Sequence, residues 1–180
     1  MSIYHFFKRR YNTVMNTLYK LIPAEQCSLK ELFPEPPMQI DYQLIIAIRW
    51  QAIKAILNNS TEIDLYCRVN SLKPEESITR ITELYYSLKM NGFNPRCPIP
   101  VDLDGNIING RHRLALCAYL GIESVYVRRI PRHLKPDSSE KLALNYAISA
   151  SDYQDLEQIY LEIYEAVRRR PTHDNQASCK

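Results

Sequence analysis

Apolar side chains recur at helical spacing in the first third of the chain. Apolar residues that recur every three or four positions predict an amphipathic helix near residues 3–21, with basic side chains on its other face. The proline-rich segment 34–37 interrupts this pattern, and a more apolar helix is predicted over residues 41–57. Both helices precede the part of the chain in which strand patterns begin.

Strand and helix patterns alternate through the middle of the chain. The predicted order is a strand at 65–69, a helix from Glu75 or Glu76 to Asn91, strands at 98–102 and 106–108 joined by an Asp104-Gly105 turn, a helix over 111–120 ending at Gly121, and a strand at 124–128. Such alternation is typical of a sheet covered by helices. We therefore predict an α+β fold, with a small mixed-sheet core and helical additions at both ends.

The pattern becomes helical again after Pro131. Residues 142–148 predict one helix, and a capping box at 151–154 predicts the start of another. The chain then divides into four parts: a helical N-terminal extension at 1–62, the mixed-sheet core at 63–131, C-terminal helices at 132–170, and a tail at 171–180 that we expect to be disordered.

Composition and charge narrow the possible functions. The net charge of +3 is the difference between 23 basic and 20 acidic residues, which is small for a general nucleic-acid binder. Specific DNA binding is therefore not expected, and phosphate recognition must be local. Five scattered cysteines without metal-ligand spacing, and an N-terminus without a signal-peptide core, indicate a cytoplasmic protein.

No apolar stretch approaches the roughly 20 residues that a membrane-spanning helix needs. The basic amphipathic helix at 3–21 fits two other roles. We favour packing of its apolar stripe on the protein's own core, and the alternative is peripheral contact with an anionic membrane surface.

The segment Gly110-Arg111-His112-Arg113 is the strongest candidate for chemistry. It follows a predicted strand and turn and opens a predicted helix, where backbone N–H groups and the helix dipole favour anions. The arginines and the histidine add cationic donors, and a glycine has no Cβ to block a ligand. This pattern predicts a phosphate site, while the simpler interpretation is the start of a solvated helix.

Four ordered segments resemble the ParB/sulfiredoxin superfamily, in particular its stand-alone ParB-like domains. They cover residues 69–76, 89–93, 98–105 and 108–122. The resemblance implies a nucleotide pocket in which Gly110, His112 and Arg113 match the phosphate-binding motif. Sulfiredoxins place a catalytic cysteine before the His-Arg pair, where this chain has Arg111, so sulfiredoxin chemistry is not expected.

Two further branches of the superfamily bind nucleotides. Chromosome-segregation ParB proteins continue into a helix-turn-helix and a dimerisation region, but only about 50 residues follow Ile130 here. Free-serine kinases are closest in pattern, because Glu76 lies where their base follows a Leu-x-Pro segment. They have an acid where this chain has Asn109, which cannot act as a base.

The resemblance implies a nucleotide-dependent phosphotransferase that uses ATP or ADP, with CTP as a further candidate, and acts on a small hydroxyl-bearing metabolite. Glu76 and His112 are the implied catalytic residues, and Mg²⁺ would lie near Asp102 and Asp104. The phosphates would be held by the segment Asn109, Gly110, Arg111, His112 and Arg113.

Three function classes stay open, of which the phosphotransferase is preferred. Asn109 in place of an acid favours a non-catalytic module that binds a nucleotide or another phosphate ligand, and a ParB-like DNA-binding regulator or nuclease is a third function class. Glu75 and Glu76 are also explained by the preference of carboxylates for the first turn of any helix.

Overall fold

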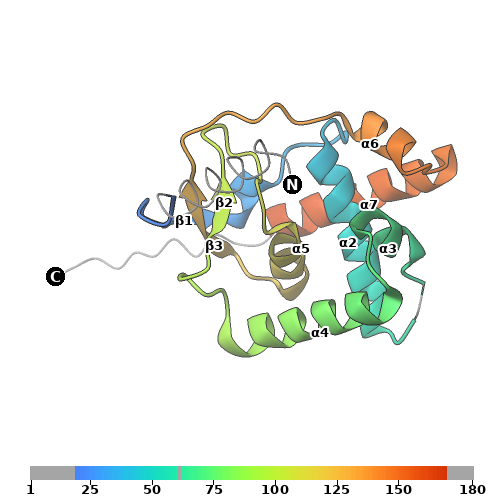
Figure 1. The fold of residues 1–180 in the computed structure, drawn as a ribbon, viewed down its shortest axis with the longest axis horizontal. Coiled ribbons are helices and arrows are strands. Elements are labelled where there is room, and N and C mark those ends of the chain that lie inside the picture. Colours follow the sequence, from blue (N-terminus) through green and yellow to red (C-terminus); the bar gives the residue numbers. More distant parts are fainter. Residues whose placement is uncertain (1–18, 61, 170–180) are drawn as a thin grey trace, which may run out of the picture.

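The computed structural model describes residues 19–60 and 62–169. The helix predicted near residues 3–21 lies almost wholly outside this part, and the tail at 171–180 lies outside it. Figure 1 shows the order β1 (Glu25–Ser28), the 3-10 helix η1 (Leu29–Leu32), α2 (Asp41–Leu57), α3 (Asp64–Asn70), α4 (Pro74–Asn91), β2 (Ile99–Val101), α5 (Arg111–Leu120), β3 (Ser124–Arg129), α6 (Ser139–Asn145) and α7 (Ala150–Arg168).

The sheet is small and mixed, which confirms the α+β prediction. Its strand order is β1-β3-β2, with β1 antiparallel and β2 parallel to the central strand β3. Val125 and Val127 of β3 are fully buried, as the middle of a covered sheet requires. The sequence did not predict β1, whose only buried side chain is Cys27, opposite Val125.

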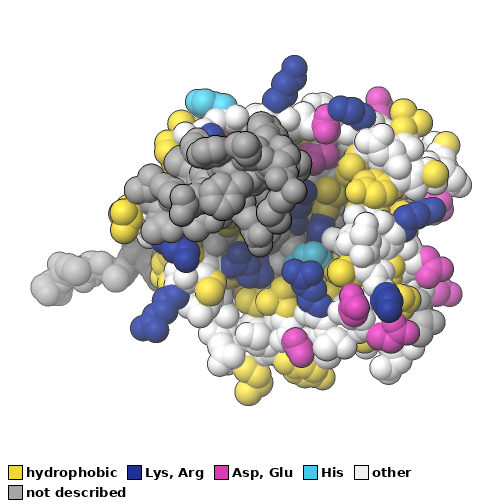
Figure 2. Space-filling model, in the orientation of Figure 1, with side chains coloured by type: hydrophobic (Ala, Val, Ile, Leu, Met, Phe, Trp, Pro, Cys, Tyr) yellow, Lys and Arg dark blue, Asp and Glu magenta, His cyan; other side chains and the backbone are white. Residues whose placement is uncertain are grey.

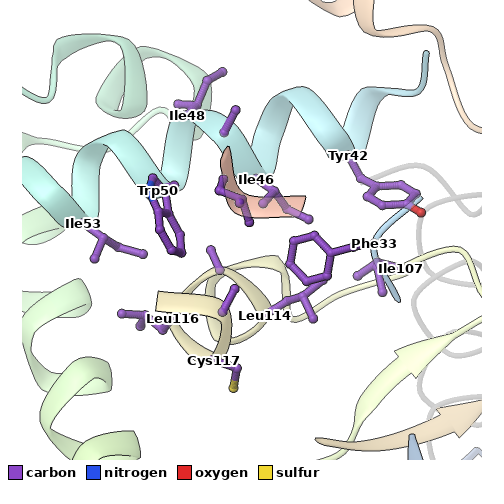
Figure 3. Packing of buried hydrophobic residues seen from close by; sticks show 14 of the residues in the cluster. Phe33, Tyr42, Ile46, Ile48, Trp50, Ile53, Ile107, Leu114, Leu116 and Cys117 are labelled. Atoms are coloured by element: carbon purple, nitrogen blue, oxygen red, sulfur yellow. The ribbon is translucent and has the colours of Figure 1, made fainter. Parts of the chain in front are cut away.

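Helix α2 forms the centre of the helical layer and contacts both α5 and α7. It is apolar on most of its surface, which is typical of a helix buried on several sides. Figure 3 shows Ile46, Trp50 and Ile53 of α2 pointing toward Leu114 and Leu116 of α5. Burial of these side chains fixes α5 against α2.

One hydrophobic cluster joins the whole described chain. It extends from Cys27 in β1 to Val167 in α7 and includes the centres of α2 and α5. The segments predicted as N-terminal and C-terminal additions therefore pack into the same core as residues 63–131.

Some predicted elements differ from the structure. The strand predicted at 65–69 is wrong, because the segment is helix α3. Its N-cap Ile63 and its residues Tyr66 and Cys67 are buried at helical spacing, which a five-residue window hides. Residues 106–108 form no strand, and only an isolated bridge joins Ile107 to Val101. The last two helices begin earlier than predicted, with Ser138 and Ser149 as their N-caps.

The described helices lack the features of a membrane span. None of them in residues 19–60 and 62–169 has both the length and the apolar character that a membrane span needs.

Candidate functional site

A glycine with unusual backbone geometry leads into α5. The bridge between Val101 and Ile107 turns the chain back along β2, so that Gly110 lies beside Ile99. Gly110 has a φ of +92°, and a Cβ at this position would lie 3.3 Å from Cγ1 of Ile99 and 3.1 Å from Nη2 of Arg113. The conformation therefore favours glycine here, and a Cβ would fit tightly against Ile99 and Arg113.

The first turn of α5 presents backbone donors. Gly110 is the N-cap and supplies no side-chain cap, so the N–H groups at the start of α5 lack the partner that capping residues provide. The side chain of Asn109 accepts a hydrogen bond from the N–H of Gly110 at 2.7 Å. Asn109 thus holds the turn while the N–H groups that follow it stay available to an anion.

A cavity of about 500 Å³ opens in front of this turn. It is lined by residues from α4 and from the start of α5, namely Arg80, Glu83, Leu84, Ser87, Asn109, Gly110, His112 and Arg113. A shallower depression of about 390 Å³ continues along α4 and shares Arg80 and Glu83 with it. Figure 2 shows Lys and Arg side chains around a histidine near the middle of this face, where α2, α4 and α5 meet in Figure 1.

Arg113 forms one wall of the cavity. Its guanidinium group donates to the backbone carbonyls of Cys97 and Pro98 and lies 5.8 Å from the centre of the Phe93 ring. Burial lowers the pKa of Arg113. These contacts fix its position against the loop before β2, so Arg113 contributes charge from a rigid position.

Arg111 points toward α2 and does not line the cavity. Its Nη2 lies 3.5 Å from Oδ2 of Asp41, and its buried Nε has no hydrogen-bond partner in the described chain. The ion pair links the beginnings of α2 and α5. Asp41 neutralises part of the charge, while one donor of Arg111 stays unsatisfied.

His112 lies on the cavity wall and is neutral at neutral pH. Its Nε2 is 2.5 Å from the hydroxyl oxygen of Tyr66, and the two rings meet edge to face. Burial, together with the charges of Arg49 and Arg80, lowers the pKa of His112 to about 3. His112 therefore does not supply the cationic donor that was expected of it, and of the two arginines in this turn only Arg113 lines the cavity.

Arg49 is a buried arginine that the sequence analysis did not assign to the site. Its side chain on α2 is only 7% exposed and donates to Oδ1 of Asn70 at 2.9 Å and to the carbonyl of Ile45 at 3.4 Å. Its Nε has no partner, and no carboxylate of the described residues forms an ion pair with it. Burial lowers its pKa to about 10. Its position within the most apolar stretch of the sequence was the signal that could have identified it.

The two acidic residues expected near Mg²⁺ do not lie in the cavity wall. Asp102 is fully buried, and its two oxygens accept hydrogen bonds from the N–H groups of Asp104, Asn106 and Leu134 and from the Asn106 side chain. Asp104 pairs with His133 at the surface. Residues 19–60 and 62–169 contain no group of three candidate metal ligands, and these two carboxylates do not fit a magnesium site beside the cavity.

Glu76 lies in the shallower depression, together with Glu75, Thr79, Arg80 and Glu83. The structure therefore places it next to the cavity at Gly110 and not among the residues that line it. Glu83 lines both hollows and was not singled out from the sequence. Its spacing of seven residues from Glu76 on one helix was the available signal, because such residues share a face.

Comparisons of the chain with protein-family models, with curated proteins and with solved structures find no match. What can be inferred about its function therefore depends on the geometry and chemistry of this cavity.

Proposed function

We propose that the protein binds the phosphate groups of a nucleotide in the cavity at Gly110 and transfers a phosphoryl group to a small hydroxyl-bearing metabolite. ATP or ADP is the favoured donor, with CTP as a further candidate. The observation that carries the proposal is the convergence of arginine charge on a glycine-capped helix N-terminus beside a cavity of about 500 Å³.

Four arginines, Arg49, Arg80, Arg111 and Arg113, supply the charge around the cavity, and most of them lack a carboxylate partner. Within the described residues, Arg111 of these four forms an ion pair with a carboxylate and the other three do not. Their free charge supports phosphate binding. Clustered cations repel one another, and the lowered pKa of Arg49 is caused by burial and by the charges of Arg111 and Arg80. A polyanionic ligand would relieve this repulsion.

Two carboxylates on α4 are candidates for the base that takes a proton from the acceptor hydroxyl. Glu83 lines the phosphate cavity, and Glu76 lines the hollow that continues from it. Phosphoryl transfer depends mainly on positioning and on neutralising charge. An acceptor lying along α4 would bring its hydroxyl toward phosphates held at Gly110, and a carboxylate within reach would accept the proton.

A non-catalytic phosphate-ligand module is the second candidate. It is favoured by the side chain of Asn109, which cannot act as a base, and by Asp102, whose oxygens already accept hydrogen bonds from the turn that follows it and from Leu134. The two candidates share the binding site and differ in whether a product forms.

Binding is tested by isothermal titration of the protein with ATP, ADP, CTP and GTP. We expect Arg80→Gln to weaken the preferred nucleotide about tenfold, which corresponds to about 1.4 kcal/mol. Arg96→Gln is the matched control, because Arg96 is exposed and lines neither hollow. Equal affinities of both variants and the wild type would contradict binding at this cavity.

Catalysis is tested by incubating the protein with Mg²⁺, the bound nucleotide and a panel of hydroxyl-bearing metabolites, with mass spectrometry of the products. We expect a phosphorylated product whose formation falls at least about a hundredfold in the variant of the true base. Glu83→Gln and Glu76→Gln distinguish the two carboxylates. Nucleotide binding without product from any acceptor would favour the non-catalytic module.

A further inference from the structure

Tyr66 makes a buried contact with the cavity wall that the proposed function does not use. Its side chain on α3 is 1% exposed, and its hydroxyl reaches Nε2 of His112 at 2.5 Å. Tyr66 and His112 come from different helices, separated by 46 positions in sequence. The pair therefore couples α3 to the first turn of α5.

The surrounding charges indicate which atom donates the proton. Arg49 on α2 and Arg80 on α4 both act electrostatically on Tyr66 and on His112. Cations near the tyrosine oxygen attract its lone pairs, which leaves the hydroxyl hydrogen for Nε2 of His112. The neighbouring thiol of Cys67 adds no cation, and burial raises the pKa of Tyr66, so the hydroxyl keeps its proton.

A neutral imidazole has one N–H, so an acceptor role for Nε2 places the hydrogen on Nδ1. Nδ1 has no hydrogen-bond partner within the described chain and is not among its buried unpaired atoms, so it is open to solvent. His112 lines the cavity at Gly110. Because Tyr66 occupies Nε2, Nδ1 is the ring nitrogen left for a ligand in the cavity.

We propose that Tyr66 is a positioning residue, whose hydroxyl donates to Nε2 of His112 and so fixes the tautomer in which Nδ1–H is a neutral donor to a phosphate oxygen. This inference depends on the proposed function for the identity of the ligand. It explains how a histidine between arginines can bind an anion without adding a further charge to a crowded site.

The test is the Tyr66→Phe variant, with Tyr160→Phe as a matched control. Tyr160 is also fully buried, and its hydroxyl donates to the carbonyl of Pro34 at 2.8 Å, so both variants lose hydrogen bonding of a buried tyrosine hydroxyl. The first measurement is the ¹⁵N chemical shifts of the His112 ring in the ligand-free protein. The second is the affinity for pyrophosphate and for ATP by isothermal titration.

We expect the Nδ1–H tautomer in the wild type and in Tyr160→Phe, and a shift toward Nε2–H in Tyr66→Phe. The affinity for pyrophosphate should fall about tenfold in Tyr66→Phe and stay unchanged in Tyr160→Phe. An Nε2–H tautomer in the wild type, or an unchanged tautomer in Tyr66→Phe, would overturn the positioning role. If the wild type shows the Nδ1–H tautomer but binds neither pyrophosphate nor ATP, the proposed function and the donor role fail together, while the tautomer assignment stands.

Discussion

Oδ2 of Asp102 accepts a hydrogen bond from the backbone N–H of Leu134 at 2.7 Å. This contact joins the turn after β2 to the segment after β3, across 32 positions of the chain. The remaining hydrogen bonds of Asp102, from Asp104 and Asn106, close the turn that leads back to Gly110. A carboxylate suggested by sequence as a metal neighbour therefore organises the approach to the cavity at Gly110.

We expect Asp102→Asn to lower the free energy of unfolding by about 3 kcal/mol, because an amide NH₂ replaces one acceptor oxygen opposite buried donors. Chemical denaturation at neutral pH measures the loss. The matched control is Asp104→Asn, where an exposed carboxylate that pairs with His133 is replaced and only a small change is expected. Equal losses in both variants would contradict the role assigned to Asp102.

The contribution of Asp102 also depends on pH. Burial would raise the pKa of Asp102, but the hydrogen bonds from Asn106, Leu134 and Asp104 outweigh it and hold the pKa below its ordinary value. A lowered pKa in the folded state means that the stabilisation is complete above the unfolded pKa, near 4, and is lost as the pH falls through the folded pKa. The difference in stability between wild type and Asp102→Asn should therefore shrink in acid.

Local signals predicted the elements that frame the site. Gly110 and Gly121 mark the two ends of α5, and both have the positive φ that glycine tolerates. Helices α2 and α4 and strand β3 were predicted because their apolar patterns are long enough to show a period. The glycine turn before α5 and the bounds of that helix could thus be predicted from sequence.

The contacts behind the first turn could not be predicted in the same way. Tyr66 belongs to a seven-residue helix whose β-branched and aromatic residues resemble a strand, so its meeting with His112 depends on tertiary packing. Arg49 is part of an apolar helix, and only the fold shows that its charge lowers the pKa of His112. Strand β1 has a polar sequence, and it forms because its backbone pairs with the edge of β3.

The conformation of Gly110 also gives a prediction about stability. Gly110→Ala should lower the free energy of unfolding by about 3 kcal/mol or more, since the left-handed conformation costs about 1–2 kcal/mol and the new methyl group meets Ile99 and Arg113. Gly105→Ala is the matched control, because Gly105 has a φ of +87° but open space around its Cβ position. The Gly105→Ala variant should lose only the part of the free energy of unfolding that is due to the left-handed conformation. Similar losses in the two variants would show that contacts of the new methyl group with Ile99 and Arg113 do not contribute to the loss of stability.

Replacing Arg49 by an apolar side chain should separate stability from binding. The guanidinium group is buried without a carboxylate partner, so Arg49→Met is expected to raise the free energy of unfolding by about 1 kcal/mol. The same change removes a charge felt at His112 and should weaken nucleotide binding about tenfold. Arg49→Lys keeps the charge and should keep most of the affinity. A destabilised Arg49→Met variant with unchanged affinity would make Arg49 a structural residue only.

The neutral state of His112 predicts how stability depends on pH in the absence of ligand. Burial and the charges of Arg49 and Arg80 lower the pKa of His112 to about 3. The histidine of the unfolded chain is therefore protonated below about pH 6.5, while His112 in the folded chain stays neutral there. Stability should therefore fall as the pH is lowered from 7 to 5, and His112→Gln should reduce that fall by about 1 kcal/mol after allowance for the partial exposure of the ring. His133→Gln is the control of opposite sign, since the hydrogen bond to Asp104 raises the pKa of His133 and its contribution grows in acid. Denaturation curves at pH 7, 6 and 5 compare the three proteins, and a parallel fall in wild type and His112→Gln would show that His112 is not held neutral by its surroundings.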